Sequence, residues 1–354
     1  MKAIQLVGRE DIEIGEVDDV RPGAGEVAVA PEFVGLCGTD HHVFLGEFEE
    51  RVPYPAIMGH EVGGRIAELG EGVEGVEVGG RVVIDPVFPC GDCPLCRAGR
   101  FNNCVNLDVL GLDCAGALAE RFVVDSANVF RLPESIEPKH AIMAELYAVG
   151  VHASRLTAIE AGDVVVIIGA GRLGLSLLDV MQYSGAETVV SVDILDSRLA
   201  IAAEIGADVT FNAREADPVE AVMDLTDGLG ADKVIEAVGH YVTLEGREPP
   251  MGMACAMIRP AGQITAMGQA EGQQPFDWRR LVLKEGRIVT SRLNLGEMPR
   301  AISMLARGSL HPGNIITNTV TPGGVQRGFE MMRDHPENVV KVAVDMTGFG
   351  GGGG

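Results

Sequence analysis

The stretch Val164–Gly174, VVVIIGAGRLG, decides the fold of half of this chain. Its five apolar residues predict a buried strand, and the Gly-x-Gly-x-x-Gly turn that follows predicts the start of a helix. In such a turn Gly169 permits the sharp bend, Gly171 lets a pyrophosphate approach the backbone, and Gly174 lets the helix pack against the strand. The segment therefore predicts a strand–turn–helix unit that binds a dinucleotide.

Side chains around the turn bear on the identity of the dinucleotide. Backbone N–H groups at Arg172 and Leu173, in the first helical turn, would bind its phosphates. Asp193 ends the next predicted strand, where its carboxylate would bind the adenosine ribose hydroxyls and repel a 2′-phosphate. NAD is therefore predicted rather than NADP, although Arg198 could accept that phosphate or stack on the adenine. The alternative is a structural glycine turn with a helix-capping aspartate.

Strands alternate with helices from about residue 161 onward, which predicts a parallel, doubly wound sheet. The predicted strands are Val164–Ile168, Thr188–Val192, Val209–Phe211, Lys233–Ala237, Gln263–Met267 and Arg287–Ser291. The predicted helices of this segment begin near Leu173 and lie near Arg198–Ile205, Pro218–Leu225 and Met251–Ile258. Past about Leu293, two more helices are predicted, Met298–Arg307 and one near Val325–Arg333.

The first 150 residues have a different pattern, with short alternating runs separated by turn signals. This pattern predicts an all-β, barrel-like unit with long loops. Its clearest strands are Glu26–Ala30, Gly63–Leu69, Arg81–Asp85 and Ala119–Val124. A final strand, Val339–Val344, could return to this unit and make it discontinuous. The tail Gly348–Gly354 is expected to be flexible and unpacked.

Composition limits the classes of function. A chain of 354 residues with 46% hydrophobic and 22% charged residues suits a globular protein of two domains. The 51 acidic residues outnumber the 28 basic ones and give a net charge of −23, which argues against nucleic acid and anionic membranes as partners. No apolar run approaches the length of a bilayer span, and no signal peptide is recognisable, so we expect a cytoplasmic protein. The acidic, lysine-poor composition fits either a high-salt habitat or a GC-rich genome.

Four of the seven cysteines lie within fifteen residues and predict a metal site. They are Cys90, Cys93, Cys96 and Cys104, with the spacing C-x2-C-x2-C-x7-C. Four thiolates from one loop can close a tetrahedral shell around zinc with no open position, which is typical of a structural site. An iron–sulfur cluster is a lesser alternative.

A second set of possible ligands is scattered along the chain. Cys37, His60 and Glu61 lie in the first unit, and Glu145 lies where the two units join. One thiolate, one imidazole and one or two carboxylates would give an incomplete shell with room for water or a substrate oxygen. The spacing alone also allows a buried, small cysteine and a histidine without a metal.

These motifs occur in the order found in the zinc-containing medium-chain alcohol dehydrogenases, and the chain resembles that family over essentially its whole length. The landmarks are Gly35–Asp40, Gly59–Gly63, the four cysteines, Glu145 before Ala148–His152, and Gly169–Gly174. The resemblance implies an α/β plus β protein, in which a GroES-like barrel catalytic domain is joined to a Rossmann domain. It places the catalytic domain at residues 1–155 and 293–347, the NAD-binding domain at 156–292 and a flexible tail at 348–354.

Residue by residue, the resemblance implies two zinc ions per chain, one catalytic and one structural. Cys37 and His60 look like ligands of the catalytic zinc, Glu61 resembles an exchangeable third ligand, and Glu145 resembles a fourth or water-bridged carboxylate. Asp40 resembles a residue that orients His60. The residues that match the structural zinc lobe are Cys90, Cys93, Cys96 and Cys104.

The resemblance also implies a reaction. A hydride would pass between the carbon of a substrate alcohol and the nicotinamide of NAD. Thr39 matches the hydroxyl that receives the substrate proton, and His42 matches the residue that passes the proton towards solvent.

Within this family, a shell of cysteine, histidine and glutamate resembles the polyol, sugar, butanediol and threonine dehydrogenases. We therefore expect a small secondary alcohol that is polyol-like or sugar-like, with L-threonine 3-dehydrogenase as the main alternative. The loop Val43–Ile57 and the stretch Leu146–Tyr147 are expected to line the substrate end, with Glu47 or Glu49 available to an ammonium group. A zinc-free or non-catalytic NAD-binding relative is the remaining alternative.

The strand Arg287–Ser291 is expected at an edge of the parallel sheet. Relatives pair this edge across a two-fold axis, so the resemblance implies a homodimer or a homotetramer.

Overall fold

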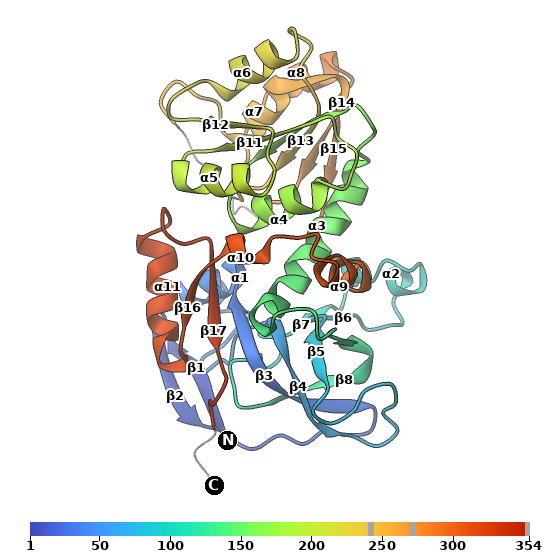
Figure 1. Ribbon diagram of the computed structural model, residues 1–354, viewed down its shortest axis with the longest axis vertical. Coiled ribbons are helices and arrows are strands. Elements are labelled where there is room, and N and C mark those ends of the chain that lie inside the picture. Colours follow the sequence, from blue (N-terminus) through green and yellow to red (C-terminus); the bar gives the residue numbers. More distant parts are fainter. Residues whose placement is uncertain (240–243, 269–272, 351–354) are drawn as a thin grey trace. The chain divides into compact units, whose positions relative to one another are not determined.

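The computed structural model describes residues 1–239, 244–268 and 273–350 and divides into two compact units (Figure 1). Unit 1 consists of Met1–Ala148 and Asn294–Gly354, and unit 2 consists of Val149–Leu293. The sequence predicts the domain changes at residues 155 and 292. The first change in the structure falls within helix α3 (Met143–Thr157), which belongs to both units.

Unit 2 is built on six parallel strands in the order β12-β11-β10-β13-β14-β15. Their bounds are β10 (Val164–Ile168), β11 (Thr188–Asp193), β12 (Val209–Asn212), β13 (Ala231–Glu236), β14 (Ile258–Ala266) and β15 (Arg287–Thr290). The strand order reverses between β10 and β13, and ligands of such sheets bind at this switch point, beyond the carboxyl ends of the strands. The predicted doubly wound parallel sheet is confirmed.

Helices connect these strands, and their starts follow from local sequence. They are α4 (Arg172–Met181), α5 (Asp196–Glu204), α6 (Pro218–Leu225), α7 (Pro250–Met257) and α8 (Trp278–Leu283). Asp217 accepts from the backbone N–H of Val219 at 2.9 Å, and the proline at the first position of α6 needs no hydrogen-bond partner for its nitrogen. Successive residues of β10 from Val165 to Ile168 are all buried, so both faces of the sheet are covered there, as expected for a parallel sheet between helices.

Unit 1 contains a sheet of seven strands in the order β16-β17-β3-β4-β5-β9, with β8 also paired to β3. Their bounds are β3 (Glu26–Leu36), β4 (Glu61–Leu69), β5 (Arg81–Ile84), β8 (Phe122–Asp125), β9 (Val129–Arg131), β16 (Ile316–Val320) and β17 (Lys341–Asp345). The sequence predicts a strand that stops at Ala30, but β3 continues to Leu36. The register shifts between Pro31 and Phe33, so the ladder accommodates the proline and resumes beyond it.

Strand β17 returns to the first unit, because its residues pair antiparallel with the end of β3. The remaining elements of unit 1 surround this sheet. They are β1 (Lys2–Gly8), β2 (Asp11–Glu16), α1 (Gly38–Phe44), β6 (Val87–Phe88), α2 (Pro94–Arg97), η1 (Phe101–Asn103), β7 (Asp108–Val109), η2 (Ser126–Asn128), η3 (Pro138–Ile142), α9 (Met298–Ala306), α10 (Pro312–Ile315), η4 (Pro322–Gly324) and α11 (Val325–Asp334).

The C-terminal tail departs from its prediction at one residue. Phe349 is partly buried against the apolar core of unit 1, and its N–H donates to the carbonyl of Met346 at 2.9 Å. The expectation that Phe349 stays unpacked is therefore wrong, because an aromatic ring gains free energy by leaving water even at a chain end. Residues 351–354 of the predicted tail lie outside the described residues.

Within the described ranges, no helix combines the length and the apolar character that a membrane span requires.

Candidate functional site

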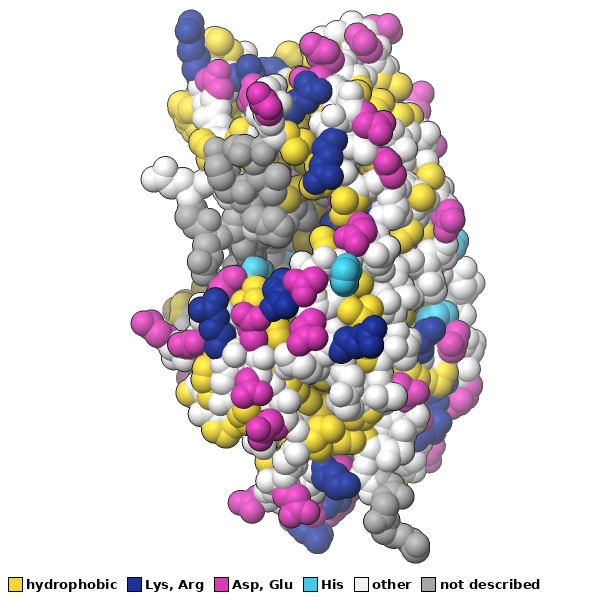
Figure 2. Space-filling view, turned by 90° about the vertical axis from the view of Figure 1, so that its left-hand side faces the viewer, with side chains coloured by type: hydrophobic (Ala, Val, Ile, Leu, Met, Phe, Trp, Pro, Cys, Tyr) yellow, Lys and Arg dark blue, Asp and Glu magenta, His cyan; other side chains and the backbone are white. Residues whose placement is uncertain are grey.

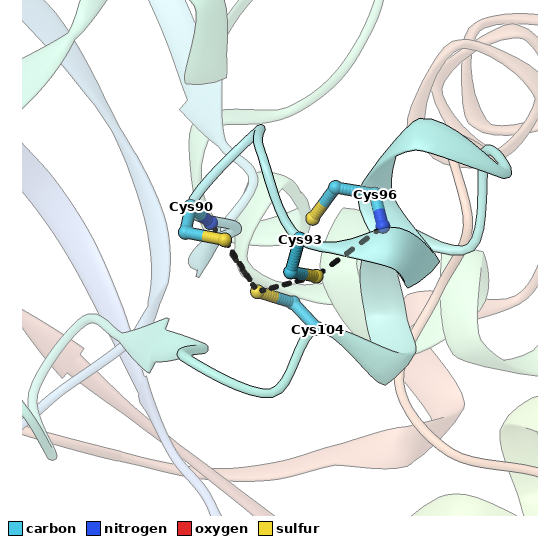
Figure 3. Close-up of side chains that lie close together, drawn as sticks. All are labelled: Cys90, Cys93, Cys96 and Cys104. Atoms are coloured by element: carbon cyan, nitrogen blue, oxygen red, sulfur yellow. Dashed lines mark hydrogen bonds between the residues drawn. The ribbon is translucent and has the colours of Figure 1, made fainter.

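The four clustered cysteines converge on one point in unit 1 (Figure 3). Cys93 is the N-cap residue of the short helix α2, Cys96 lies within that helix, and Cys90 and Cys104 lie before and after it. The Sγ atoms of Cys90 and Cys104 are 3.4 Å apart, and those of Cys93 and Cys104 are 3.9 Å apart. All four are free thiols, since a disulfide needs about 2.05 Å.

The spacing of these sulfurs fits a tetrahedral zinc shell. Zinc–sulfur bonds of about 2.3 Å put neighbouring sulfurs about 3.8 Å apart. The backbone N–H of Cys96 donates to Cys93 Sγ at 3.4 Å, and this bond is the largest of several contributions that lower the pKa of Cys93 to about 6. The backbone N–H of Cys90 donates to Cys104 Sγ at 3.3 Å. Such donors favour the thiolate, which is the form that binds a metal.

A second cluster of unit 1 brings together Cys37, His60 and Glu61, with one ligand atom of each within 4.8 Å of the others. Cys37 is the N-cap residue of α1, directly after β3, and Glu61 is the first residue of β4. Gly35 and Glu61 are paired residues of the β3–β4 ladder. Antiparallel pairing of these strands therefore brings Cys37 close to His60 and Glu61, although a long connecting segment separates them in sequence. His60 is 6% exposed and Glu61 is fully buried.

Asp40 ties this cluster together. It is fully buried, and its Oδ2 accepts from the backbone N–H of Cys37 at 2.8 Å. Its Oδ1 accepts from the backbone N–H of Gly59 at 3.3 Å and lies 3.4 Å from His60 Nδ1. One carboxylate therefore fixes the start of α1, the turn before β4 and the imidazole, as expected of a residue that orients a metal ligand.

The charges in the cluster influence one another. Burial and the charge of Glu61 would raise the pKa of Cys37, but the charges of His60 and Lys341 and a hydrogen bond from His60 lower it overall. Burial would lower the pKa of His60, yet the charges of Asp40 and Cys37 raise it well above its usual value. Binding of a metal requires the thiolate and the neutral imidazole, so it would release protons here.

Lys341 is a member of this cluster that the sequence does not reveal. Its side chain is fully buried, its Nζ pairs with Glu61 Oε2, and it also donates to the carbonyl of Leu36 at 3.2 Å. Lys341 is 280 residues from Glu61 in sequence and reaches it only because β17 pairs with β3. The other oxygen, Glu61 Oε1, is buried and has no hydrogen-bond partner within the described part of the chain.

Glu145 lies near the cluster without joining it. It sits in the first turn of α3 and is 7% exposed. Among the described residues, the ligand atoms of Cys37, His60 and Glu61 lie within 4.8 Å of one another, and Glu145 is not part of this group. Burial, with the charge of Glu61 added, raises the pKa of Glu145 to about 8. The structure therefore separates Glu145 from the three-residue group.

The residues predicted to carry the proton lie on α1. The Oγ1 of Thr39 is 3.9 Å from Cys37 Sγ. The Nδ1 of His42 is 2.5 Å from Glu47 Oε2, and both side chains are more than a third exposed.

Three charged side chains of the loop Val43–Ile57 contact other protein groups. Glu47 holds His42, and Glu49 accepts from the Tyr54 hydroxyl at 3.2 Å. Arg51 binds both oxygens of Asp113 in a bidentate pair. Glu47 and Glu49 therefore each already have one partner, and their availability to an ammonium group stays a prediction. Leu146 and Tyr147, which are predicted to lie at the substrate end, are buried in the first turns of α3.

The glycine turn of unit 2 has the geometry that a dinucleotide needs. Gly169 adopts φ +100°, and a Cβ on Gly174 would overlap the carbonyl oxygen of Gly169. Gly171 borders open space, since an added Cβ would meet only an Arg198 nitrogen at 3.9 Å. Gly171 is the N-cap of α4, a ten-residue helix with no acidic residue in its first turn, so its free N–H groups suit a phosphate.

Asp193 closes the turn from the neighbouring strand. Its Oδ2 accepts from the N–H of Ala170 at 2.7 Å, and its Oδ1 accepts from those of Ile194 and Leu195 at 2.7 and 3.0 Å. Arg198 Nη1 lies 3.9 Å from Asp193 Oδ2, and burial lowers the pKa of Arg198. A cationic and an anionic side chain therefore stand together where a ribose would bind.

The surface agrees with the composition. On the face drawn in Figure 2, acidic side chains are spread widely, with arginine and lysine side chains among them rather than gathered in one patch. This distribution offers no basic stripe for a nucleic acid on that face.

Two family models match the chain. Residues 23–134 match the alcohol dehydrogenase GroES-like domain, and residues 173–307 match the zinc-binding dehydrogenase model. The first range includes the four cysteines and the cluster of Cys37, His60 and Glu61, and the second includes the end of the glycine turn.

Similar proteins cover nearly the whole chain. An L-threonine 3-dehydrogenase of Pyrococcus abyssi is 36% identical over 91% of this chain and 92% of its own length. A 2-dehydro-3-deoxy-L-galactonate 5-dehydrogenase of Pseudoalteromonas atlantica is 31% identical over 96% of this chain and 97% of its own. A crystal structure of an Escherichia coli alcohol dehydrogenase (rspB) complexed with NADH superposes with a TM-score of 0.89, at 30% identity, over 98% of this chain and 99% of that one.

Proposed function

We propose a substrate class from the premise that follows: this chain belongs to the family of zinc-binding alcohol dehydrogenases with a GroES-like domain. On that premise, the chain oxidises a secondary hydroxyl of a small polyol or sugar-like molecule. The chain is an NAD(P)-dependent zinc oxidoreductase that acts on CH–OH groups. The observation that carries the proposal is the convergence of Cys37, His60 and Glu61 in unit 1.

These three side chains fit a catalytic metal. A thiolate, an imidazole and a carboxylate leave one coordination position for a substrate oxygen. Zinc bound there supplies a Lewis acid that lowers the pKa of the substrate hydroxyl. Asp40 orients His60. Glu145 is a second buried carboxyl near the cluster, and we propose that it would contact the metal through a water molecule.

We assign the proton path to Thr39 and His42. Thr39 lies in the first turn of α1, and its Oγ1 is 3.9 Å from the Sγ of Cys37, which supports its hydroxyl as the group that takes the substrate proton. His42 is partly exposed and can pass the proton to solvent. Glu47 fixes the orientation of the imidazole through Nδ1.

The four-cysteine lobe is proposed to hold the second zinc. Its closed set of ligands leaves no position for substrate, so its role is structural. The expected metal content is two zinc ions per chain.

NAD is proposed as the preferred form of the cofactor. The phosphates would bind at the glycine turn and the N–H groups of Arg172 and Leu173, and the Asp193 carboxylate would repel a 2′-phosphate. Replacement of Asp193 by alanine should narrow the preference for NAD over NADP by at least tenfold in kcat/KM, because Arg198 then faces the phosphate alone. An unchanged ratio would contradict the role of Asp193.

L-threonine is the second candidate substrate, since the relative from Pyrococcus abyssi is named for it. The pairing of Glu47 with His42 and of Glu49 with Tyr54 weakens the argument for an ammonium site in this loop. The name of the Pseudoalteromonas atlantica relative supports a sugar-like substrate.

A single assay tests the function. The purified protein is incubated with polyols, aldoses, butanediols and threonine, each with NAD or NADP, and the absorbance of the reduced cofactor is followed with and without a chelator. Chelator-sensitive reduction of NAD with a polyhydroxylated substrate supports the proposal. A strict requirement for the amine of threonine would replace it with the second candidate.

We further propose a homodimer or homotetramer in the cytoplasm. Helix α8 exposes Trp278, Val282 and Leu283, and β15 forms one edge of the sheet in unit 2. An exposed edge with apolar side chains nearby favours association. All seven cysteines are free thiols, which suits a reducing compartment. Light scattering that gives the mass of one chain at micromolar concentration would refute the assembly, and cell fractionation tests the compartment.

A further inference from the structure

Glu61 and Lys341 form an ion pair that is completely buried in unit 1. Burial of two charges is unfavourable unless each is compensated, so the pair needs a reason to be kept. One partner, Glu61, belongs to the proposed zinc site. The other, Lys341, comes from the last strand of the sheet and has no place in the proposed reaction.

The sheet is built so that this lysine can reach the glutamate. Lys341 begins β17, Glu61 begins β4, and β3 lies between these two strands. The lysine side chain must therefore cross β3. At the crossing point stands Gly35, which pairs with Glu61 on one side and with Ala343 on the other. A Cβ on Gly35 would overlap Glu61 Oε2 and would lie 3.1 Å from Lys341 Cε. The backbone thus leaves a passage that the ion pair fills.

The two oxygens of Glu61 have different surroundings. Oε2 is held by Lys341 Nζ, which is itself fixed by the carbonyl of Leu36 at 3.2 Å. Oε1 is buried without a hydrogen-bond partner among the described residues. A buried carboxylate oxygen without a donor is costly, and a cation bound between Glu61, Cys37 and His60 would compensate it.

We propose that Lys341 is a positioning residue that restricts Glu61 to one oxygen as a zinc ligand and so keeps Glu61 exchangeable. This inference rests on the proposed function, because it requires zinc at Cys37, His60 and Glu61. The lysine occupies Oε2 and brings a positive charge close to the metal position. Both effects weaken the hold of Glu61 on the metal, which leaves the coordination position open to a substrate oxygen.

The test is the substitution Lys341→Met, which removes the charge and the donor and keeps an unbranched side chain. Glu61 would then bind through both oxygens. We expect zinc to leave the catalytic site at least tenfold more slowly in a chelator competition, and kcat to fall by at least tenfold. In protein loaded with Co2+, the visible absorption should weaken, as it does when a fifth ligand joins the ion.

Two further variants serve as controls. Lys341→Arg keeps the charge and should restore zinc release to within about threefold of the wild type. Lys284→Met removes another lysine whose Nζ donates to backbone carbonyls, in this case those of Cys255, Ala256 and Ile258 in unit 2. This change should lower the stability of unit 2 and leave both zinc release and the Co2+ spectrum unchanged.

The outcomes separate the inference from the proposed function. A wild-type chain that binds only one zinc, in the cysteine lobe, would overturn both. A wild-type chain with two zinc ions, together with a Lys341→Met protein of unchanged zinc release and spectrum, would overturn the role of Lys341 alone. If Lys341→Met does not fold, Lys341→Gln, which keeps a donor but no charge, replaces it. Zinc should then leave the catalytic site of Lys341→Gln more slowly than that of the wild type. Zinc release at the wild-type rate in this variant would also refute the inference.

Discussion

Two metal clusters of unit 1 are built in opposite ways. The four-cysteine lobe takes every ligand from residues 90–104, around one short helix. The cluster of Cys37, His60 and Glu61 takes its ligands from the residue before α1 and from the start of β4, and its carboxylate pairs with a lysine from β17. The first cluster depends on local turns, whereas the second depends on the pairing of three strands. The geometry of a local cluster is determined mainly by its own loop. The geometry of a distributed cluster also depends on correct pairing of the strands that carry its residues.

The largest expected effect comes from removing a ligand of the distributed cluster. Cys37→Ser should lower kcat by about 10³-fold, because a Lewis acid contributes several kcal/mol to such reactions and each tenfold is worth about 1.4 kcal/mol. Metal analysis should show one zinc fewer per chain, with the thermal unfolding of the lobe unaffected. Retention of two zinc ions with full activity would remove Cys37 from the ligand set.

The corresponding change in the lobe should act on stability instead. Cys104→Ser should also cost one zinc per chain, and it should destabilise unit 1 by roughly 3 kcal/mol, since loss of a structural metal is among the few changes that reach this size. Activity per folded chain should stay within about threefold of the wild type. Calorimetry measures the first effect, and the rate at a temperature well below unfolding measures the second. A fall in kcat as large as that of Cys37→Ser would mean that the two clusters are not independent.

The difference between the local lobe and the distributed cluster also explains which parts of the fold and of the site the sequence predicts. The lobe can be predicted because its ligands and turn residues are neighbours in sequence. Strand β10 can be predicted because a run of five apolar residues, Val164–Ile168, precedes the glycine turn. The contact of Lys341 with Glu61 cannot be predicted from the sequence. Nothing at position 341 indicates that β17 pairs with β3 and that the lysine side chain crosses Gly35 to reach Glu61. Membership of Cys37, His60 and Glu61 in one site came from family resemblance, and the residue types alone left it open.

Helix α3 shows a second limit. Its first residues, from Met143 to Ala148, are all buried, so they lack the alternation of apolar and polar residues that indicates a helix. The position of Glu145 in its first turn, close to the cluster but outside the three-residue group, depends on the packing of that helix. Likewise, the engagement of Glu47 by His42 depends on how the loop folds back, which composition does not specify.

A smaller effect is expected from the residue that joins the parts of the distributed cluster. Asp40→Asn keeps the size of the side chain and removes its charge, so His60 loses the partner that orients it while the amide oxygen can still accept from Cys37. Zinc affinity of the catalytic site should fall about 10- to 100-fold, which is typical for partners of metal-binding histidines. Competition with a chromogenic chelator measures this, and the zinc of the lobe in the same sample provides the internal reference. An unchanged affinity would show that the turn before β4 positions His60 without Asp40.

The smallest effect is expected in the lobe, at Gly91. This residue has φ +77°, and a Cβ there would meet no atom within 4 Å, so alanine would be strained but not crowded. The left-handed backbone costs a non-glycine residue about 1–2 kcal/mol, which for a unit of this size corresponds to roughly 2–8 °C in Tm. Zinc content should remain at two per chain, because the four sulfurs keep their places and a bound metal offsets a strain of this size. Loss of the lobe zinc in Gly91→Ala would show that the local turn, more than the metal, determines the geometry of the four cysteines.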